Sequence, residues 1–130
     1  ETQTYRILGT SLWLTGMTTR TPDSHDRSIT ISTPFEEASV TKPFTVSGSV
    51  TISPFENTLA CRIYLPDGTL VNEAPLMVDS GGEMGGPCTF SREFDLSNAG
   101  ITGPVIIQFL DLSAADGSTI ALGSVILKVH

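Results

Sequence analysis

The chain has 130 residues, of which seven are basic and fourteen acidic, so its formal net charge is −7. That length fits one compact domain with a single hydrophobic core. The basic residues are scattered singly, so no basic stripe can neutralise phosphates, and we exclude a nucleic-acid partner. No apolar run is long enough to cross a bilayer, so we expect no transmembrane segment. The charged fraction is only 16%, and such a neutral polar surface is typical of extracellular β-domains.

Residues 1–28 are interpreted as an arm and linker that precede the main domain. Thr18 to Asp26 is polar and has the composition of a linker. The part before it carries enough large apolar side chains to need cover, so we expect it to pack along a sheet edge as one added strand. That edge belongs either to its own domain or, by domain swapping, to a neighbour's, which would make a homodimer. The apolar residues of the arm are Tyr5, Ile7, Leu8, Leu12, Trp13 and Leu14.

The next part of the chain, from Ile29 onward, alternates apolar and polar residues in short runs separated by Gly, Pro, Asn and Asp. In Phe44–Ile52 this alternation places four apolar side chains on one face, as in a half-buried antiparallel strand. A second run, Leu59–Leu65, repeats the pattern and is followed by Asp67-Gly68, a pair that favours a tight turn. We expect its hairpin partner from Thr69 to about Val78.

Four further strands complete the domain. They are expected at Ile29–Ser32, Cys88–Leu96, Val105–Leu110 and Ile120–Val129, and Ala114–Gly117 is the predicted turn before the last one. Because Val105–Leu110 is almost continuously apolar, we expect it to be a central strand covered on both sides. About seven short strands at this spacing predict an all-β fold, an immunoglobulin-like antiparallel β-sandwich over residues 29–130, with the arm strand added to it.

Several motifs of this domain resemble one known family. They include Pro43-Phe44-Thr45-Val46-Ser47-Gly48, Phe55-Glu56-Asn57, Gly86-Pro87-Cys88-Thr89-Phe90 and Ser113-Ala114-Ala115-Asp116-Gly117-Ser118. Together they are similar to the immunoglobulin-like domain of bacterial spore germination. The resemblance covers roughly Ile29 to Val129, and the arm has no counterpart in it.

The resemblance implies a non-catalytic module of secreted or lipid-anchored envelope proteins, and it supplies no catalytic or ligand residues. We therefore expect an extracellular or cell-envelope binding or structural module, without a cofactor, whose partner is a protein or a wall polymer. The chain begins at Glu1 without a Met or a charged leader, so either a signal or lipid anchor was removed or the chain was trimmed. Neither His25, in the linker, nor His130, at the terminus, is positioned for a Ser-His-Asp triad, so we do not expect an enzyme.

Two other binding functions stay open. One is a carbohydrate-binding sandwich, which is disfavoured because Trp13, Tyr5 and Tyr64 are the only Trp and Tyr residues that could stack on a sugar. The other is a peptidase inhibitor that would insert the long loop Asp79–Pro87 into a cleft. Trp13 in the arm and Met84 in that loop are the candidate interaction residues.

Cys61 and Cys88 are the only cysteines, and both lie on predicted inward faces. In an exported domain they could form a disulfide that contributes roughly 3 kcal/mol, and two buried free thiols are the alternative. Two cysteines so far apart, without neighbouring histidines, are a poor zinc site, and no metal is expected.

Other residues carry weaker predictions. Asp67, Asp111 and Asp116 could offer oxygen ligands to calcium at one end of the sandwich, but Asp in these positions is first a turn residue. Phe35 and Phe55 are expected to cap the core, or to form an interaction patch if both are exposed. The pair Glu36-Glu37 is interpreted as the solvated flank of a turn.

Overall fold

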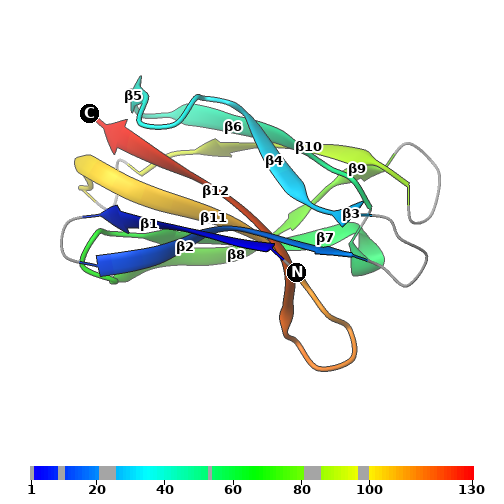
Figure 1. Cartoon of the computed structure of the whole chain (residues 1–130). Helices are drawn as coiled ribbons and strands as arrows, with labels where there is room; N and C mark the ends of the chain where they lie inside the picture. The colour runs from blue at the N-terminus through cyan, green and yellow to red at the C-terminus, as the bar shows by residue number, and fades with distance from the viewer. Residues whose placement is uncertain (1, 9–10, 21–25, 53, 81–85, 97–99) are drawn as a thin grey trace.

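The computed structural model describes residues 2–8, 11–20, 26–52, 54–80, 86–96 and 100–130. Within these ranges the chain is built from β-strands in two layered sheets, with one short 3-10 turn at Phe55–Asn57 (Figure 1). The larger sheet has eight strands and the smaller has four. The predicted immunoglobulin-like β-sandwich is confirmed.

The order of strands in the larger sheet is β1-β2-β12-β11-β7-β8. Two short strands attach to this path: β3 pairs with β2, and β5 pairs with β12 in parallel. Their bounds are β1 Thr2–Leu8, β2 Ser11–Arg20, β3 Asp26–Arg27, β5 Ser39–Val40, β7 Thr58–Tyr64, β8 Leu70–Met77, β11 Gly103–Leu112 and β12 Thr119–Val129. The smaller sheet has the order β4-β6-β10-β9, with β4 Ile29–Thr33, β6 Phe44–Val50, β9 Asp79–Ser80 and β10 Cys88–Phe94.

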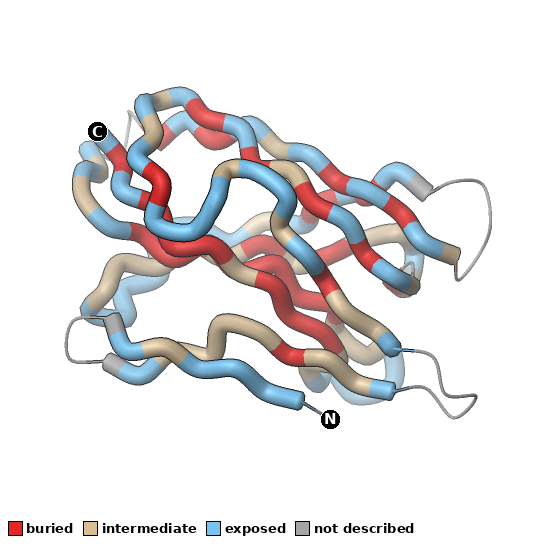
Figure 2. Tube along the Cα trace, turned by 45° about the horizontal axis from the view of Figure 1, so that its top comes forward, coloured by how far each residue is buried: buried red, intermediate tan, exposed pale blue. Residues whose placement is uncertain are grey.

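The hydrophobic core lies between the two sheets, where Figure 2 shows the buried segments gathered. Alternate side chains of each strand point inward, so that β6 buries Phe44, Val46 and Val50 and leaves Thr45 exposed. A glycine is required opposite Phe90: a Cβ at Gly48 would lie 2.5 Å from the Phe90 ring and 2.3 Å from the carbonyl oxygen of Thr30. The alternation read from the sequence therefore identified the inward faces correctly.

Strand β11 is covered on both sides, as its continuous apolar run predicted. Seven consecutive residues of this strand, 105–111, are buried. One face belongs to the main core, and the other contributes Leu110 to a second cluster with Met17 and Leu122. The arm therefore supplies part of the cover for the outer face of the larger sheet.

The arm forms two strands where the sequence predicted one. Strands β1 and β2 pair antiparallel from Leu8↔Ser11 to Thr2↔Thr18, and β2 continues the sheet at β12. The hairpin lets the two halves of the arm pair with each other, and Gly9 is the sequence signal that could have located the break. The predicted linker is also shorter than expected, because Thr18–Arg20 belongs to β2 and Asp26 to β3.

Among the described residues there is no helix with the length and apolar character needed to span a bilayer.

Candidate functional site

The two cysteines lie on opposite sheets, both facing the core. Cys61 belongs to β7 and Cys88 to β10, and in the structure both side chains are buried with no disulfide between them. Burial raises the pKa of the Cys61 thiol to about 11, although the positive charge of Arg92 opposes the shift. Such a thiol stays protonated at neutral pH and is therefore a poor nucleophile. The disulfide that the sequence allowed is not formed in this structure.

The three aspartates proposed as calcium ligands do not converge. Asp67 accepts a hydrogen bond from the backbone N–H of Thr69 (2.9 Å), and Asp116 accepts one from that of Ser118 (2.9 Å). These hydrogen bonds lower the pKa of both exposed carboxyls. Because β7 and β11 are antiparallel, the turn of Asp67 lies at the opposite end of the sheet from Asp116. Each aspartate stabilises its own turn, and the described residues contain no cluster of three or more possible metal ligands.

Asp111 is not a turn residue but a buried partner of Arg27. Its side chain is 1% exposed, and its Oδ2 lies 2.9 Å from Nη1 of Arg27, whose side chain is 22% exposed. Burial raises the pKa of the Asp111 carboxyl, while the hydrogen bond and the charge of Arg27 oppose the shift. Since Arg27 belongs to β3, this ion pair ties the residues that follow the arm to the edge of the core.

Trp13 packs against the protein's own sheet. Its ring lies 5.2 Å from that of Tyr64 on β7, at an interplanar angle of 53°. Its Nε1 is buried and has no hydrogen-bond partner among the described residues. Trp13 therefore anchors the arm on the outer face of the larger sheet and is not itself an exposed contact. Met84, the other candidate interaction residue, lies outside the described residues.

The arm does present another apolar surface, which we call the hairpin patch and define as Tyr5, Ile7 and Leu12. Ile7 and Leu12 are opposite each other in the register of β1 and β2, and their exposed fractions are 72% and 68%. Tyr5, two residues before Ile7 on the same face, is 49% exposed. The patch lies on β1 and β2. Strand β1 is the last strand of its sheet, so its far edge is unpaired within the described chain.

Edge strands are normally protected by charged side chains. The only charged residue of β1 is Arg6, whose guanidinium lies 3.4 Å from the carboxylate of Glu36 and 3.7 Å from that of Glu37. This charge is therefore compensated within the molecule, and the edge of β1 is close to neutral.

Glu36 and Glu37 are not simply the solvated flank of a turn. An oxygen of Glu36 accepts a hydrogen bond from the backbone N–H of Ile126, and the N–H of Glu37 donates to the carbonyl oxygen of Ile126 (2.7 Å). Together these two hydrogen bonds occupy the backbone edge of β12 at Ile126, between the residues of β12 that pair with β2 and those that pair with β5. The sequence could not show this, because Ile126 is 90 residues away from Glu36.

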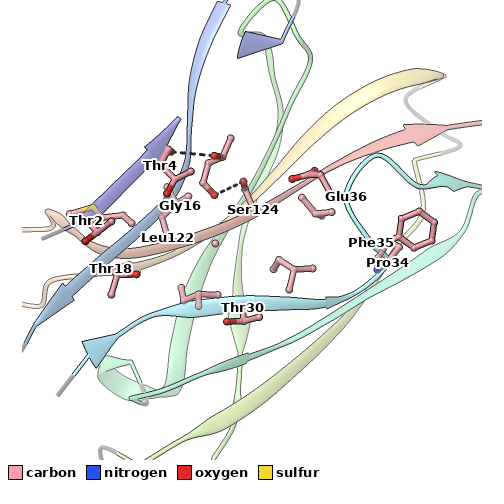
Figure 3. Close-up of a pocket in the computed structure, with 16 residues that line it drawn as sticks. Thr2, Thr4, Gly16, Thr18, Thr30, Pro34, Phe35, Glu36, Leu122 and Ser124 are labelled. Atoms are coloured by element: carbon pink, nitrogen blue, oxygen red, sulfur yellow. Dashed lines mark hydrogen bonds between the residues drawn. The ribbon is translucent and has the colours of Figure 1, made fainter. Parts of the chain in front are cut away.

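A groove opens between the β1–β2 hairpin and β4, with β12 as its floor (Figure 3). Its volume is about 330 Å³. We call it the threonine groove, because five of the six hydroxyl side chains that line it are threonines. Glu36, Pro34, Phe35 and several apolar residues complete the lining. The hydroxyls belong to Thr2, Thr4, Thr15, Thr18, Thr30 and Ser124.

Phe35 stands at one end of the threonine groove and is 76% exposed. The prediction that it caps the core is therefore wrong. It follows Pro34, where the chain leaves β4 and crosses to the other sheet to form β5, so its side chain is not held between the sheets. The side chain of Phe55 lies outside the described residues, so the proposed pairing of the two rings remains a prediction.

The comparison with known families agrees with this fold. Residues 28–118 match the family model of the immunoglobulin-like domain of bacterial spore germination. The chain belongs to this family. The match begins after the β1–β2 hairpin, so neither the hairpin patch nor the wall of the groove that the hairpin supplies is part of the matched region. A comparison with curated proteins found no match.

Proposed function

We propose that the chain is a non-catalytic binding module of a secreted or cell-envelope protein, lipid-anchored in its full-length form, and that it contacts other proteins through the β1–β2 hairpin. Membership of the spore-germination family supports the bacterial setting. The observation that carries the protein contact is the hairpin patch, which places exposed Tyr5, Ile7 and Leu12 beside a strand edge that no other described strand pairs with.

An edge of this kind favours addition of a β-strand from a partner. Main-chain hydrogen bonds along β1 supply affinity in such a contact, and alternate side chains supply specificity. Here the alternate side chains Tyr5 and Ile7 are apolar, and Arg6 is compensated by Glu36 and Glu37. The partner strand is therefore expected to be uncharged and partly apolar. A second copy of this chain comes close to that requirement, since the only charge of β1, Arg6, is compensated by Glu36 and Glu37.

The test places a photo-crosslinking residue at Ile7 and, as a matched control, at Met77, which is 66% exposed on β8 at the other end of the sheet. Each protein is incubated with the envelope fraction of the source bacterium, and cross-linked partners are identified by mass spectrometry. We expect a partner at position 7 that is absent at position 77 and is lost in the Leu12→Lys variant. A cross-linked second copy, seen also as a dimer by solution mass, would name the partner.

The proposal is wrong if positions 7 and 77 give the same products. It is also wrong if the envelope fraction retains the Ile7→Lys/Leu12→Lys variant as well as it retains the wild-type protein. Both replaced residues are exposed, so the melting temperature of this variant is expected to stay close to the wild-type value, which separates loss of contact from loss of fold.

A further inference from the structure

We infer that the threonine groove binds a short neutral saccharide. This inference deepens the proposed binding function by adding a second surface and a ligand class, and it does not require the hairpin patch. The groove has a volume of about 330 Å³, within the range of roughly 300–1,000 Å³ that is usual for small-ligand sites. Most of its polar groups are hydroxyls, which hydrogen-bond to sugar hydroxyls without adding charge.

The hydrogen bonds within the groove leave two of its hydroxyls, those of Ser124 and Thr15, ready to accept. The hydroxyl of Ser124 donates to the carbonyl oxygen of Thr15 (2.7 Å), and the hydroxyl of Thr15 donates to the carbonyl oxygen of Thr4 (3.2 Å), as the dashed lines in Figure 3 show. A hydroxyl has one donor hydrogen and two acceptor lone pairs. Once the hydrogen is committed to the backbone, the lone pairs remain for the O–H groups of a ligand.

Glu36 adds a fixed acceptor to the same wall. One carboxylate oxygen is held by the backbone N–H of Ile126 and the other lies 3.4 Å from Arg6, yet the side chain remains 41% exposed. A carboxylate has about four lone-pair sites, so acceptor capacity is left over. The groove is therefore rich in acceptors, and it suits a ligand with many O–H donors.

Charge excludes an acidic ligand. Among the described residues that line the groove there is no Lys, Arg or His, and Glu36 is negative. The guanidinium of Arg6, which contacts Glu36, is already engaged in ion pairs with Glu36 and Glu37. The two carboxylates and one guanidinium leave one net negative charge beside the groove, which disfavours a phosphate, a uronic acid or another anion and favours a neutral saccharide.

The ring of Phe35 supplies the apolar element of the site. It stands exposed at the end of the groove, where the C–H face of a sugar ring can lie against it (Figure 3). An extended peptide fits less well, because β4 approaches β12 too closely at this point to add a strand. A Cβ at Gly123 would lie only 2.7 Å from the carbonyl oxygen of Ile29.

The experiment measures binding of four tetrasaccharides by calorimetry. Maltotetraose, cellotetraose and tetra-N-acetylchitotetraose are the neutral probes, and tetragalacturonate is the anionic control. We expect at least one neutral probe to bind with a Kd of about 1 mM or below, and the anionic one to bind at least tenfold more weakly. The Thr18→Val/Thr30→Val variant, which keeps the side-chain shape, and the Phe35→Ala variant should each weaken binding at least tenfold.

Thr45→Val, on an exposed position of β6 outside the groove, is the matched control and should bind as the wild type does. The inference is overturned if no neutral probe binds, if the groove variants bind unchanged, or if tetragalacturonate binds equally well. Ile7→Lys/Leu12→Lys should keep saccharide binding, so that failure of the groove and failure of the hairpin contact are distinguished. Unchanged melting temperatures of the groove variants show that the fold is kept.

Discussion

Replacing Asp111 by Asn tests whether the buried ion pair with Arg27 holds the residues after the arm on the core. At 2.9 Å and an effective dielectric constant of about 20, the Coulomb attraction of the pair is about 6 kcal/mol. The raised pKa of Asp111 indicates that the desolvation of its buried carboxylate offsets this attraction. The pair as a whole therefore contributes little, whereas losing one partner leaves the other charge unpaired.

Breaking a buried pair from one side typically costs about 3–5 kcal/mol. The raised pKa of Asp111 means that the folded state favours its neutral form, which Asp111→Asn imitates, and Arg27 keeps 22% of its side chain exposed and can be rehydrated. We therefore expect Asp111→Asn to change the free energy of unfolding by less than about 1 kcal/mol. Arg27→Met should lower it by about 3–5 kcal/mol, because it leaves the Asp111 carboxylate buried without its partner.

Urea denaturation of the wild type, both single variants and the double variant measures these free energies. Because the second replacement removes a charge that the first has already left unpaired, the double variant should be less destabilised than the sum of the two singles, with a coupling of about 2 kcal/mol. Strictly additive effects, or an Arg27→Met variant within about 0.5 kcal/mol of the wild type, would refute a role for this pair in stability.

Three further predictions concern pH, packing and thiols. Burial raises the native pKa of Asp111 above its ordinary value of 3.8, so the folded state takes up this proton at a higher pH than the unfolded state does. The wild type should therefore gain unfolding free energy relative to Asp111→Asn as the pH falls from the native pKa to 3.8. Urea titrations in which this difference decreases would contradict the assigned cause. Gly48→Ala should destabilise by about 3 kcal/mol or more in thermal unfolding, because the added methyl group meets Thr30 and Phe90, and Thr45→Ala on the same strand is the mild control. In the native protein at pH 8, Cys61 should not react with a thiol reagent. After denaturation without reductant, two thiols per chain should react. If no thiol reacts after denaturation, Cys61 and Cys88 are bonded to each other.

The sequence was informative wherever the deciding signal was local. Alternation with period two identified the inward side chains of β6, β7 and β10, and Asp67-Gly68 and Ala114–Gly117 marked turns that the structure contains. The continuous run in β11 predicted cover on both faces, but it could not say that β2 provides part of it. The arm was predicted as one strand because the prediction relied on the number of its apolar residues and did not use Gly9 as a signal for a break.

The two candidate surfaces depended on contacts that no local pattern encodes. The threonine groove joins residues of β1 and β2 to β4 and to β12 near the end of the chain, and threonines in alternating strands look only like solvent-facing residues. Phe35 was assigned to the core because large aromatic side chains usually lie there. Its exposure follows from the crossing of the chain between sheets after β4, a property of the topology.

The sequence by itself determined the seven main strands of the sandwich, their inward faces and the tight turns, because each is set by neighbours a few residues apart. The tertiary structure alone decided that the arm folds onto the outer face of its own sheet, that Glu36 closes the edge of β12, and that Arg27 pairs with Asp111. The residues joined by the last two contacts are separated in the sequence by 90 and 84 positions, respectively. Such contacts follow from the order of strands in the sheets, and the alternation within any one strand carries no information about that order.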